Sequence, residues 1–285
     1  MNNIYQLSYY PWITQHKTPE VIRQNIDVFA RALQEELSKS TGQQVLVNVL
    51  PAMEVPQQIL SLAQNQSHIA LMNPLGFIYA RQRNNQINAA AVALRIIDGN
   101  IGDSYFAQIY THVDTGIKDL PALRKRSIGY GSSQSTSNFI IPAFELKQAG
   151  IHPFAAFRRM EFVGGHDRVA MAVYNRQIDA GAGHDGVIID LAGQAGYSDA
   201  KEKLITLHRS KPIPSDPVAV NVSTSDEYNA IQKALVLASL NSPAKEAISE
   251  FWGNAQGLRE TTYQPYEYLL NAVGELGLTE KDIFG

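Results

Sequence analysis

The sequence predicts two α/β units, each a parallel sheet with helices on its faces. Strand-type and helix-type segments alternate from the N-terminus to about residue 94, and the alternation restarts at residue 115 and runs to about 207. A chain of 285 residues with 45% apolar residues is long enough for about two domains with cores of their own. We therefore expect a two-lobed α/β protein.

The first alternation contains a helix with clear end signals. Thr18 is a typical N-cap, Pro19 suits the first helical position and Glu20 suits the first turn, and the apolar residues that follow have helical spacing as far as Gly42. The other expected elements are strands at 7–10, 45–50, 68–72 and 87–94, helices at 55–66 and 77–83, and turns at 73–76 and 98–100.

The second alternation follows a strand in which Tyr105, Ala107 and Ile109 share one face. We expect crossings between the lobes near Tyr105 and in a proline-spaced connector around Pro214. The first lobe would then contain residues 1–106 and 217–285, and the second residues 107–216. Expected in the second lobe are strands at 105–110, 127–130, 160–163, 178–182 and 203–207 and helices at 117–123, 138–149, 167–175 and 185–194; tail helices are expected at 225–240, 243–252 and about 265–276.

Charge and cysteine content exclude several classes of protein. With 24 basic and 27 acidic residues, the chain has no general electrostatic footprint for nucleic acid or anionic lipid. The count of 0 cysteines excludes disulfides, thiolate metal sites and cysteine nucleophiles. The first residues lack the basic and apolar regions of a signal peptide, and no window has the apolar length of a membrane span. We hypothesise a mature form whose export signal was removed.

A polar cradle, residues 131–137, lies between the strand 127–130 and the helix 138–149. Its hydroxyls include those of Ser135, Thr136 and Ser137. Hydroxyls and free N–H groups at a helix start, together with the helix dipole, favour an anion. The structural alternative is that Ser135 or Thr136 is only an N-cap.

Three other patterns suggest competing chemistries. Residues 181–186 fit G-x-G-x-x-G, but they come last in their α/β run and the candidate acid Asp199 lies in a loop, so a dinucleotide site is disfavoured. The pairs 166–167 and 184–185 join His to Asp and suggest a metal site, although no H-E-x-x-H pattern supports one. The alternative makes the aspartates helix caps, which we favour for Asp167.

His166 is explained better as an N–H donor to an anion. A Ser135, His166 and Asp185 triad would suggest a serine hydrolase, but the sequence lacks a G-x-S-x-G elbow.

Several motifs together resemble the phosphate/phosphite/phosphonate-binding proteins of ABC transporters, the PhnD-like periplasmic substrate-binding proteins. The similarity covers roughly residues 115–220, whereas the first hundred residues fit only generally. The matching segments are 130–138 (Tyr-Gly-Ser-Ser-Gln-Ser-Thr-Ser-Asn), Ile141-Pro142, Gly150-Ile151, 165–173, 177–182 and 213–218.

The resemblance implies a type II periplasmic-binding fold, with two lobes, a two-strand hinge and closure onto the ligand. It also implies binding roles for particular residues. Ser135, Thr136, Ser137, His166 and Tyr105 would hold the phosphonate oxygens, and Asp216 and Asp185 are candidates for an amine of an aminophosphonate. The segment 51–54 departs from the family pattern, because it lacks an expected aromatic residue.

The expected function is that of the solute-binding component of an ABC importer. It would capture a phosphonate, phosphite or phosphate in the interlobe cleft and present it to a membrane permease. We expect a periplasmic or extracytoplasmic monomer with no cofactor, metal, catalytic residue or nucleic-acid partner. Two alternatives stay open: a ligand-sensing module for a signalling partner, and a hydrolase that uses His166 and Asp185.

Overall fold

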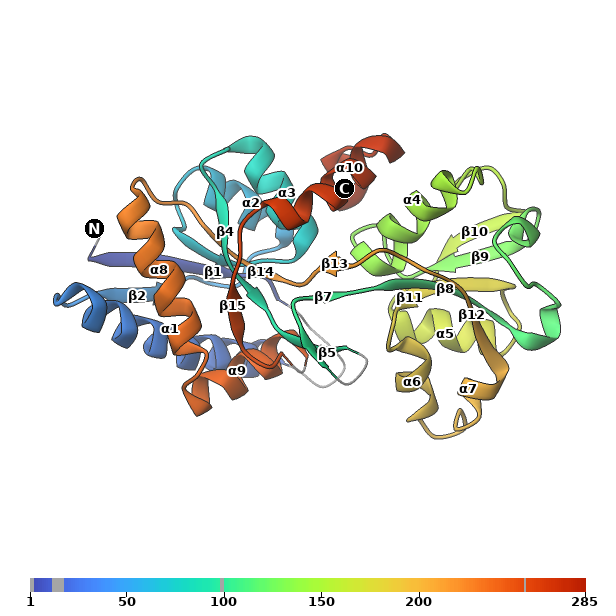
Figure 1. The fold of residues 1–285 in the computed structure, drawn as a ribbon, viewed down its shortest axis with the longest axis horizontal. Coiled ribbons are helices and arrows are strands. Elements are labelled where there is room, and N and C mark those ends of the chain that lie inside the picture. The colour runs from blue at the N-terminus through green and yellow to red at the C-terminus, as the bar shows by residue number, and fades with distance from the viewer. Residues whose placement is uncertain (1–2, 12–17, 98–99, 254) are drawn as a thin grey trace. The chain divides into compact units, whose positions relative to one another are not determined.

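The structure is a computed structural model that describes residues 3–11, 18–97, 100–253 and 255–285 (Figure 1). The chain forms two compact units: Met1–Ser104 with Pro214–Tyr266, and Tyr105–Ile213 with Glu267–Gly285. Each unit contains a sheet covered by helices, as the alternation predicts. Most of the turn expected at 98–100 lies outside the described residues.

The sheet of the first unit has the strand order β15-β4-β14-β3-β1-β2. Strand β1 runs parallel to β2 and β3, but β14 is antiparallel to both of its neighbours, so the sheet is mixed rather than parallel. The sequence analysis missed β14 because its four residues directly follow the proline-rich connector. The bounds are β1 Ile4–Tyr9, β2 Leu46–Val49, β3 Ile69–Leu71, β4 Asn88–Ala93, β14 Pro217–Val220 and β15 Leu258–Glu260, with a separate hairpin of β5 Arg95–Ile97 and β6 Asn100–Gly102.

Helices cover both faces of this sheet, with α2 and α3 on one side and α1, α8 and α9 on the other (Figure 1). The end signals of α1 are confirmed: Thr18 Oγ1 accepts from the Val21 N–H at 3.4 Å, and Gly42 is left-handed. Helix α3 begins earlier than expected because the Asn73 side chain caps it. The bounds are α1 Pro19–Thr41, α2 Val55–Ala63, α3 Pro74–Arg83, α8 Ser225–Ala238 and α9 Ser242–Trp252.

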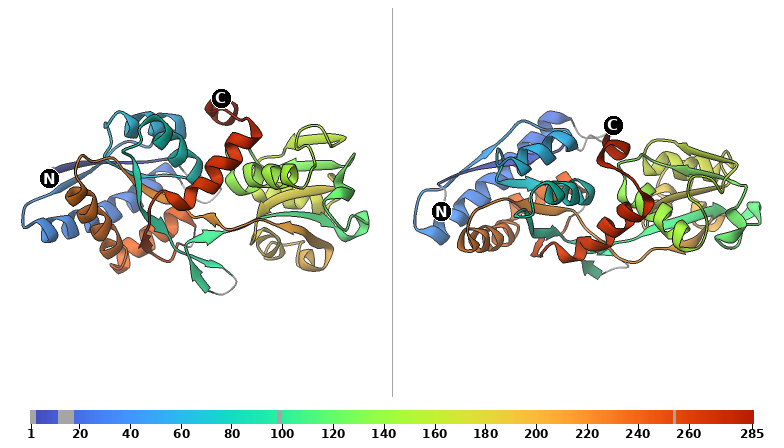
Figure 2. Two further views of the ribbon diagram at one scale, coloured as in Figure 1. Left: turned by 45° about the horizontal axis from the view of Figure 1, so that its top comes forward. Right: turned by 90° about the horizontal axis from the view of Figure 1, so that it is seen from above.

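The sheet of the second unit has the order β10-β9-β11-β8-β12. The three strands β9, β10 and β11 are parallel, and β8 is antiparallel to β11 and β12. Helices α5, α6 and α7 lie on one side of it and α4 on the other (Figure 2). The bounds are β8 Ala107–His112, β9 Ser127–Tyr130, β10 Arg159–Phe162, β11 Ala180–His184, β12 Leu204–Arg209, α4 Ile141–Gln148, α5 His166–Tyr174, α6 Val187–Ala192 and α7 Ala200–Lys203, and the short strands β7 Ser104–Tyr105 and β13 Ile213–Pro214 pair with each other.

The glycines of the G-x-G-x-x-G pattern have a packing role. A Cβ on Gly181 would lie 2.6 Å from Val169 Cγ1, and one on Gly183 would lie 2.8 Å from Val187 Cγ1. Both glycines are inside β11, where α5 and α6 approach the strand. Close helix–strand packing therefore explains the pattern without a nucleotide.

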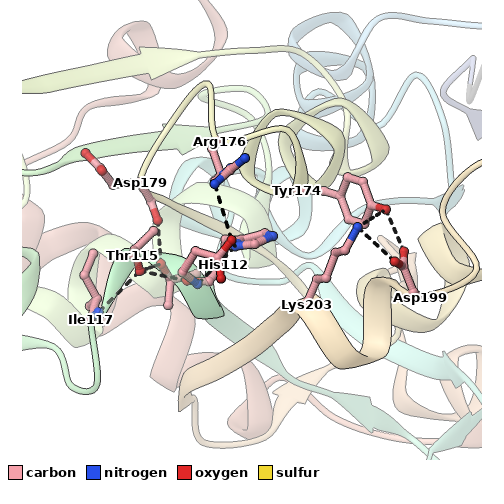
Figure 3. Close-up of polar contacts among 10 residues, drawn as sticks. His112, Thr115, Ile117, Tyr174, Arg176, Asp179, Asp199 and Lys203 are labelled. Atoms are coloured by element: carbon pink, nitrogen blue, oxygen red, sulfur yellow. Dashed lines mark hydrogen bonds and ion pairs between the residues drawn. The ribbon is translucent and has the colours of Figure 1, made fainter.

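Polar contacts brace the edge of this sheet where β9 and β11 begin (Figure 3). The Asp179 carboxylate accepts from the N–H and the hydroxyl of Ser127, and the Asp179 carbonyl accepts from Thr111. Nearby, the Tyr174 hydroxyl donates to Asp199, which also pairs with Lys203. This edge is opposite to the one at which the parallel strands end.

The C-terminal segment belongs to the second unit, whereas the sequence assigns it to the first lobe. Helix α10 (Glu267–Leu276) packs on α4, where the Tyr268 hydroxyl donates to Glu145 Oε1 at 2.5 Å and His208 Nε2 lies 3.0 Å from Glu145 Oε2. In α11 (Glu280–Phe284), the carbonyl of Ile283 accepts from the Ser133 hydroxyl. The chain thus passes between the units three times, after Ser104, Ile213 and Tyr266, and not twice.

We expect Tyr268→Phe to lower the free energy of unfolding by about 1–2 kcal/mol, because it removes a hydrogen bond to a charged carboxylate. Urea denaturation at neutral pH would measure the change as a lower midpoint. Tyr263→Phe is the matched control, since its hydroxyl makes no hydrogen bond within the described residues while its ring keeps the contact with Arg81. Equal midpoints for the two variants would contradict this account of how α10 is held.

Candidate functional site

Most of the predicted binding residues lie at one edge of the second unit's sheet. The cradle follows β9, His166 follows β10, and Asp185 follows β11, and these parallel strands end at the same edge. Strand β8 begins there, since Ala107 lies opposite His184 and the Asp185 N–H donates to the Phe106 carbonyl. Tyr105, two residues before Ala107, therefore also belongs to this edge. Asp216 belongs to the first unit.

The cradle leads into a helix that starts with a π-helical turn. Ser135 is the N-cap: its Oγ accepts from the Asn138 N–H at 3.1 Å, and its carbonyl accepts from the Ile140 N–H. The turn η3 (Thr136–Ile140) continues directly into α4. The N-cap alternative is thus correct for Ser135, and Thr136 and Ser137 occupy the first turn. Such π-turns inside helices are frequent at functional sites.

Thr136 and Ser137 have polar groups that the protein does not satisfy. Their side chains are largely buried, with 6% and 4% of the residue exposed. Among the residues that the structure describes, neither hydroxyl has a hydrogen-bond partner, and the first N–H groups of a helix have no intrahelical acceptor. The two hydroxyl oxygens are not among the fully buried unpaired atoms, so each still reaches the surface and can meet an acceptor from outside the chain.

Asn138 holds the cradle in shape, and the sequence analysis did not single it out. It is fully buried, and its Oδ1 accepts a short hydrogen bond from the Gly131 N–H at the end of β9. The Gly131 Cα must lie close to this side chain, since a Cβ there would be 2.8 Å from it. Asn138 therefore fixes the path of the cradle between strand and helix.

His166 is a neutral donor with a defined tautomer. Its Nδ1 accepts the His184 N–H at 3.2 Å, which requires a lone pair on Nδ1 and leaves the proton on Nε2. His166 keeps some solvent exposure, but desolvation by the surrounding protein lowers the pKa of its ring to about 3. The neighbouring His184 ring, 4.7 Å away between centroids, adds to this shift. Both observations describe an uncharged imidazole at neutral pH that offers one N–H.

The two aspartates that follow the histidines are not helix caps. Helix α5 has Gly165 as its N-cap, with a left-handed φ of 57°, and no side chain bonds to its first N–H groups. Asp167 lies inside the first turn, so the expected cap is wrong. The N-cap position of α6 belongs to Gly186, one residue after Asp185.

Asp185 faces an arginine that the sequence analysis missed. Arg209 Nη2 lies 3.5 Å from Asp185 Oδ2, and the guanidinium stacks on the Phe106 ring at 3.8 Å. Arg209 is the last residue of β12, which runs two residues beyond the strand expected at 203–207. In the sequence, the signal for Arg209 was that a charged residue stands at the end of a strand.

Asp216 is buried in the first unit beside Arg95. It directly precedes β14, and the Met72 N–H donates to the Pro217 carbonyl, so Asp216 lies where β3 ends. Arg95 Nη2 donates to Asp216 Oδ2 at 2.5 Å. Burial raises the pKa of Asp216, and the positive charge of Arg95 opposes that shift. Arg95, which follows the apolar run of β4, was not singled out from the sequence.

The hydrolase and metal alternatives find no matching geometry. Ser135 accepts the Asn138 N–H, and His166 Nδ1 accepts a backbone N–H, so it cannot donate to Asp185 as a triad histidine would. In the described ranges, no group of three or more His, Cys, Asp or Glu side chains is placed to hold a metal ion. None of the described helices has the length and apolar composition needed to cross a membrane.

Solved structures with the same fold cover nearly the whole chain. XAC2383 from Xanthomonas citri, bound to chloride ion, has a TM-score of 0.75 at 17% identity and covers 97% of this chain and 99% of its own. PhnD1 from Prochlorococcus marinus, in complex with methylphosphonate, has a TM-score of 0.68 at 16% identity over 96% and 98%. The phosphonate-transporter binding protein PA3383 from Pseudomonas aeruginosa has a TM-score of 0.59 at 17% identity over 94% and 85%.

These similarities confirm the predicted fold class, a two-unit α/β fold of the periplasmic-binding type. A family model described as "ABC transporter, phosphonate, periplasmic substrate-binding protein" matches residues 13–266. The match covers most of the 285 residues and includes the cradle, His166 and both acidic candidates. The chain therefore belongs to the family of periplasmic phosphonate-binding proteins that serve ABC transporters.

Proposed function

We propose that this protein captures a phosphonate, phosphite or phosphate on the cradle of its second unit and delivers it, as an extracytoplasmic monomer, to a membrane permease. The observation that carries the proposal is the first turn of η3. There Thr136 and Ser137 are largely buried residues, and their hydroxyls have no protein partner in the described chain. A tetrahedral oxyanion supplies the acceptors that this turn lacks.

The proposed site binds the anion with neutral donors. The groups are the hydroxyls and N–H groups of Thr136 and Ser137, the Nε2–H of His166 and the phenol of Tyr105; Ser135 contributes chiefly as the cap that orients the turn. Hydrogen bonds to a charged group contribute about 1.5–3 kcal/mol each, so a few offset the dehydration of the anion. Binding of this kind requires neither a metal nor catalysis.

We expect Ser137→Ala to weaken methylphosphonate binding by about 10-fold to 100-fold, because it removes one charge-assisted hydrogen bond. Calorimetric titration with methylphosphonate, phosphite and phosphate would measure the loss. Ser132→Ala is the matched control, since Ser132 is an exposed serine of the same cradle. No binding of any of the three anions by the wild-type protein, or unchanged affinity in Ser137→Ala, would refute the proposed site.

The low pKa of His166 predicts how stability depends on pH. Below about pH 6.5 the unfolded chain protonates this histidine, but the folded chain does not until about pH 3. The free energy of unfolding should therefore fall as the pH drops through this window, by at most about 1.4 kcal/mol per pH unit and by less because the ring is partly exposed.

Urea denaturation at pH 7.5 and pH 5 tests this expectation with His166→Gln, which should lose less stability on acidification than the wild type. Its amide N–H replaces Nε2–H, so methylphosphonate affinity at pH 7.5 should stay within about fivefold. His152→Gln, at an exposed histidine, should behave as the wild type. The same pH dependence in His166→Gln and the wild type would show that His166 does not resist protonation.

A further inference from the structure

We propose that the C-terminal helix α11 positions the anion cradle, and that Ser133 is the positioning residue through which it acts. The inference rests on the proposed function and adds to that site an element 150 residues later in the chain. The cradle and the tail from Glu267 both belong to the second unit, so the argument concerns that unit by itself.

Ser133 lies in a tight turn directly before the N-cap of η3. The Ser135 N–H donates to the Ser132 carbonyl at 3.2 Å, which closes the turn around Ser133 and Gln134. Ser135 is also the N-cap, whose Oγ accepts from the Asn138 N–H at 3.1 Å. The orientation of this turn therefore determines how the cap enters the helix, and with it the direction of the N–H groups and hydroxyls of the first helical turn.

A hydrogen bond to the tail fixes that orientation. The Ser133 hydroxyl donates to the carbonyl of Ile283 in α11 at 2.9 Å. Ser133 is partly buried, and Ile283 is only 1% exposed. The last carbonyls of a helix have no donor within the helix, so Ser133 satisfies a group that α11 leaves free. One hydrogen bond thus closes the end of α11 and holds the middle of the cradle turn.

Helix α11 is itself ordered, so it can serve as a support. In its capping box, Thr279 Oγ1 accepts from the Asp282 N–H at 3.3 Å, and Asp282 Oδ2 accepts from the Thr279 N–H at 2.8 Å. Before it, α10 packs on α4 and η3, and Gln148 Nε2 donates to Glu275 Oε2 at 3.1 Å. The tail therefore contacts both the turn that precedes the cap and the helix that follows it.

The consequence for binding concerns how often the cradle is in its ordered form. An anion held by several donors binds only when the turn brings them together, and the apparent affinity falls with the fraction of molecules in that form. The net contribution of one hydrogen bond corresponds to about a threefold to tenfold change in such an equilibrium. We therefore expect Ser133→Ala to bind methylphosphonate about threefold to tenfold more weakly than the wild type.

Calorimetric titration of the full chain with methylphosphonate at pH 7.5 tests this role. Ser133→Thr keeps a hydroxyl and should bind within about twofold of the wild type. Asp282→Ala breaks the capping box at an exposed position and should weaken binding by about threefold, because α11 is then a looser support. Lys281→Ala is the matched control: it changes an exposed residue of the same helix outside the box and should bind as the wild type does.

The double variant Ser133→Ala/Asp282→Ala separates positioning from general destabilisation. Since both changes act through one contact, it should bind as weakly as Ser133→Ala alone. Additive losses would overturn the role of Ser133 as the link between α11 and the cradle.

Unchanged affinity in Ser133→Ala or Asp282→Ala, or an equal loss in Ser133→Ala and Ser133→Thr, would overturn the inference while leaving the oxyanion site intact. If the wild type binds neither methylphosphonate nor phosphite nor phosphate, the proposed function fails and the inference fails with it. The results therefore separate an error about the support of the cradle from an error about its ligand.

Discussion

The first N–H groups of a helix cannot be satisfied within the helix, and the second unit is arranged around this constraint at the end of β9. Ser135 accepts one of these groups, and Asn138 fixes the incoming loop through Gly131. Thr136 and Ser137 then complete a turn whose hydroxyls have no partner in the described chain. In the function proposed here, an anion with several acceptor oxygens would satisfy these groups together.

The arginines nearest the candidate residues lie beside carboxylates, and the proposed site relies on neutral donors. The proposed donors to the oxyanion are hydroxyls, backbone N–H groups and a neutral His166, whose backbone partner and surroundings both favour the uncharged ring. The arginines near the candidate residues, Arg95 and Arg209, pair with Asp216 and Asp185 instead. In the proposed site, neutral donors held in an ordered frame would recognise the shape of the anion.

Local sequence signals were sufficient for most elements but not for sheet order or for the residues that brace the site. Thr18, Pro19 and Gly42 mark the ends of α1 because capping depends on neighbouring residues alone. By contrast, β14 takes a central place in the first sheet through pairing with strands more than 120 residues earlier in the chain. The pairing of Arg95 with Asp216 is equally distant in sequence, with a separation of 121 residues, and no short pattern indicates it.

The sequence by itself determined the two α/β runs, the family and the hydroxyl-rich cradle, because periodicity, capping and short motifs are properties of contiguous residues. Tertiary structure alone decided that Ser135 acts as a cap, that His166 is a neutral donor held by His184, and that the tail from residue 267 belongs to the second unit. It also decided which arginine lies beside Asp216 and which beside Asp185. A carboxylate's availability depends on which cation the fold places beside it, and that choice is made by strands and helices far apart in the chain.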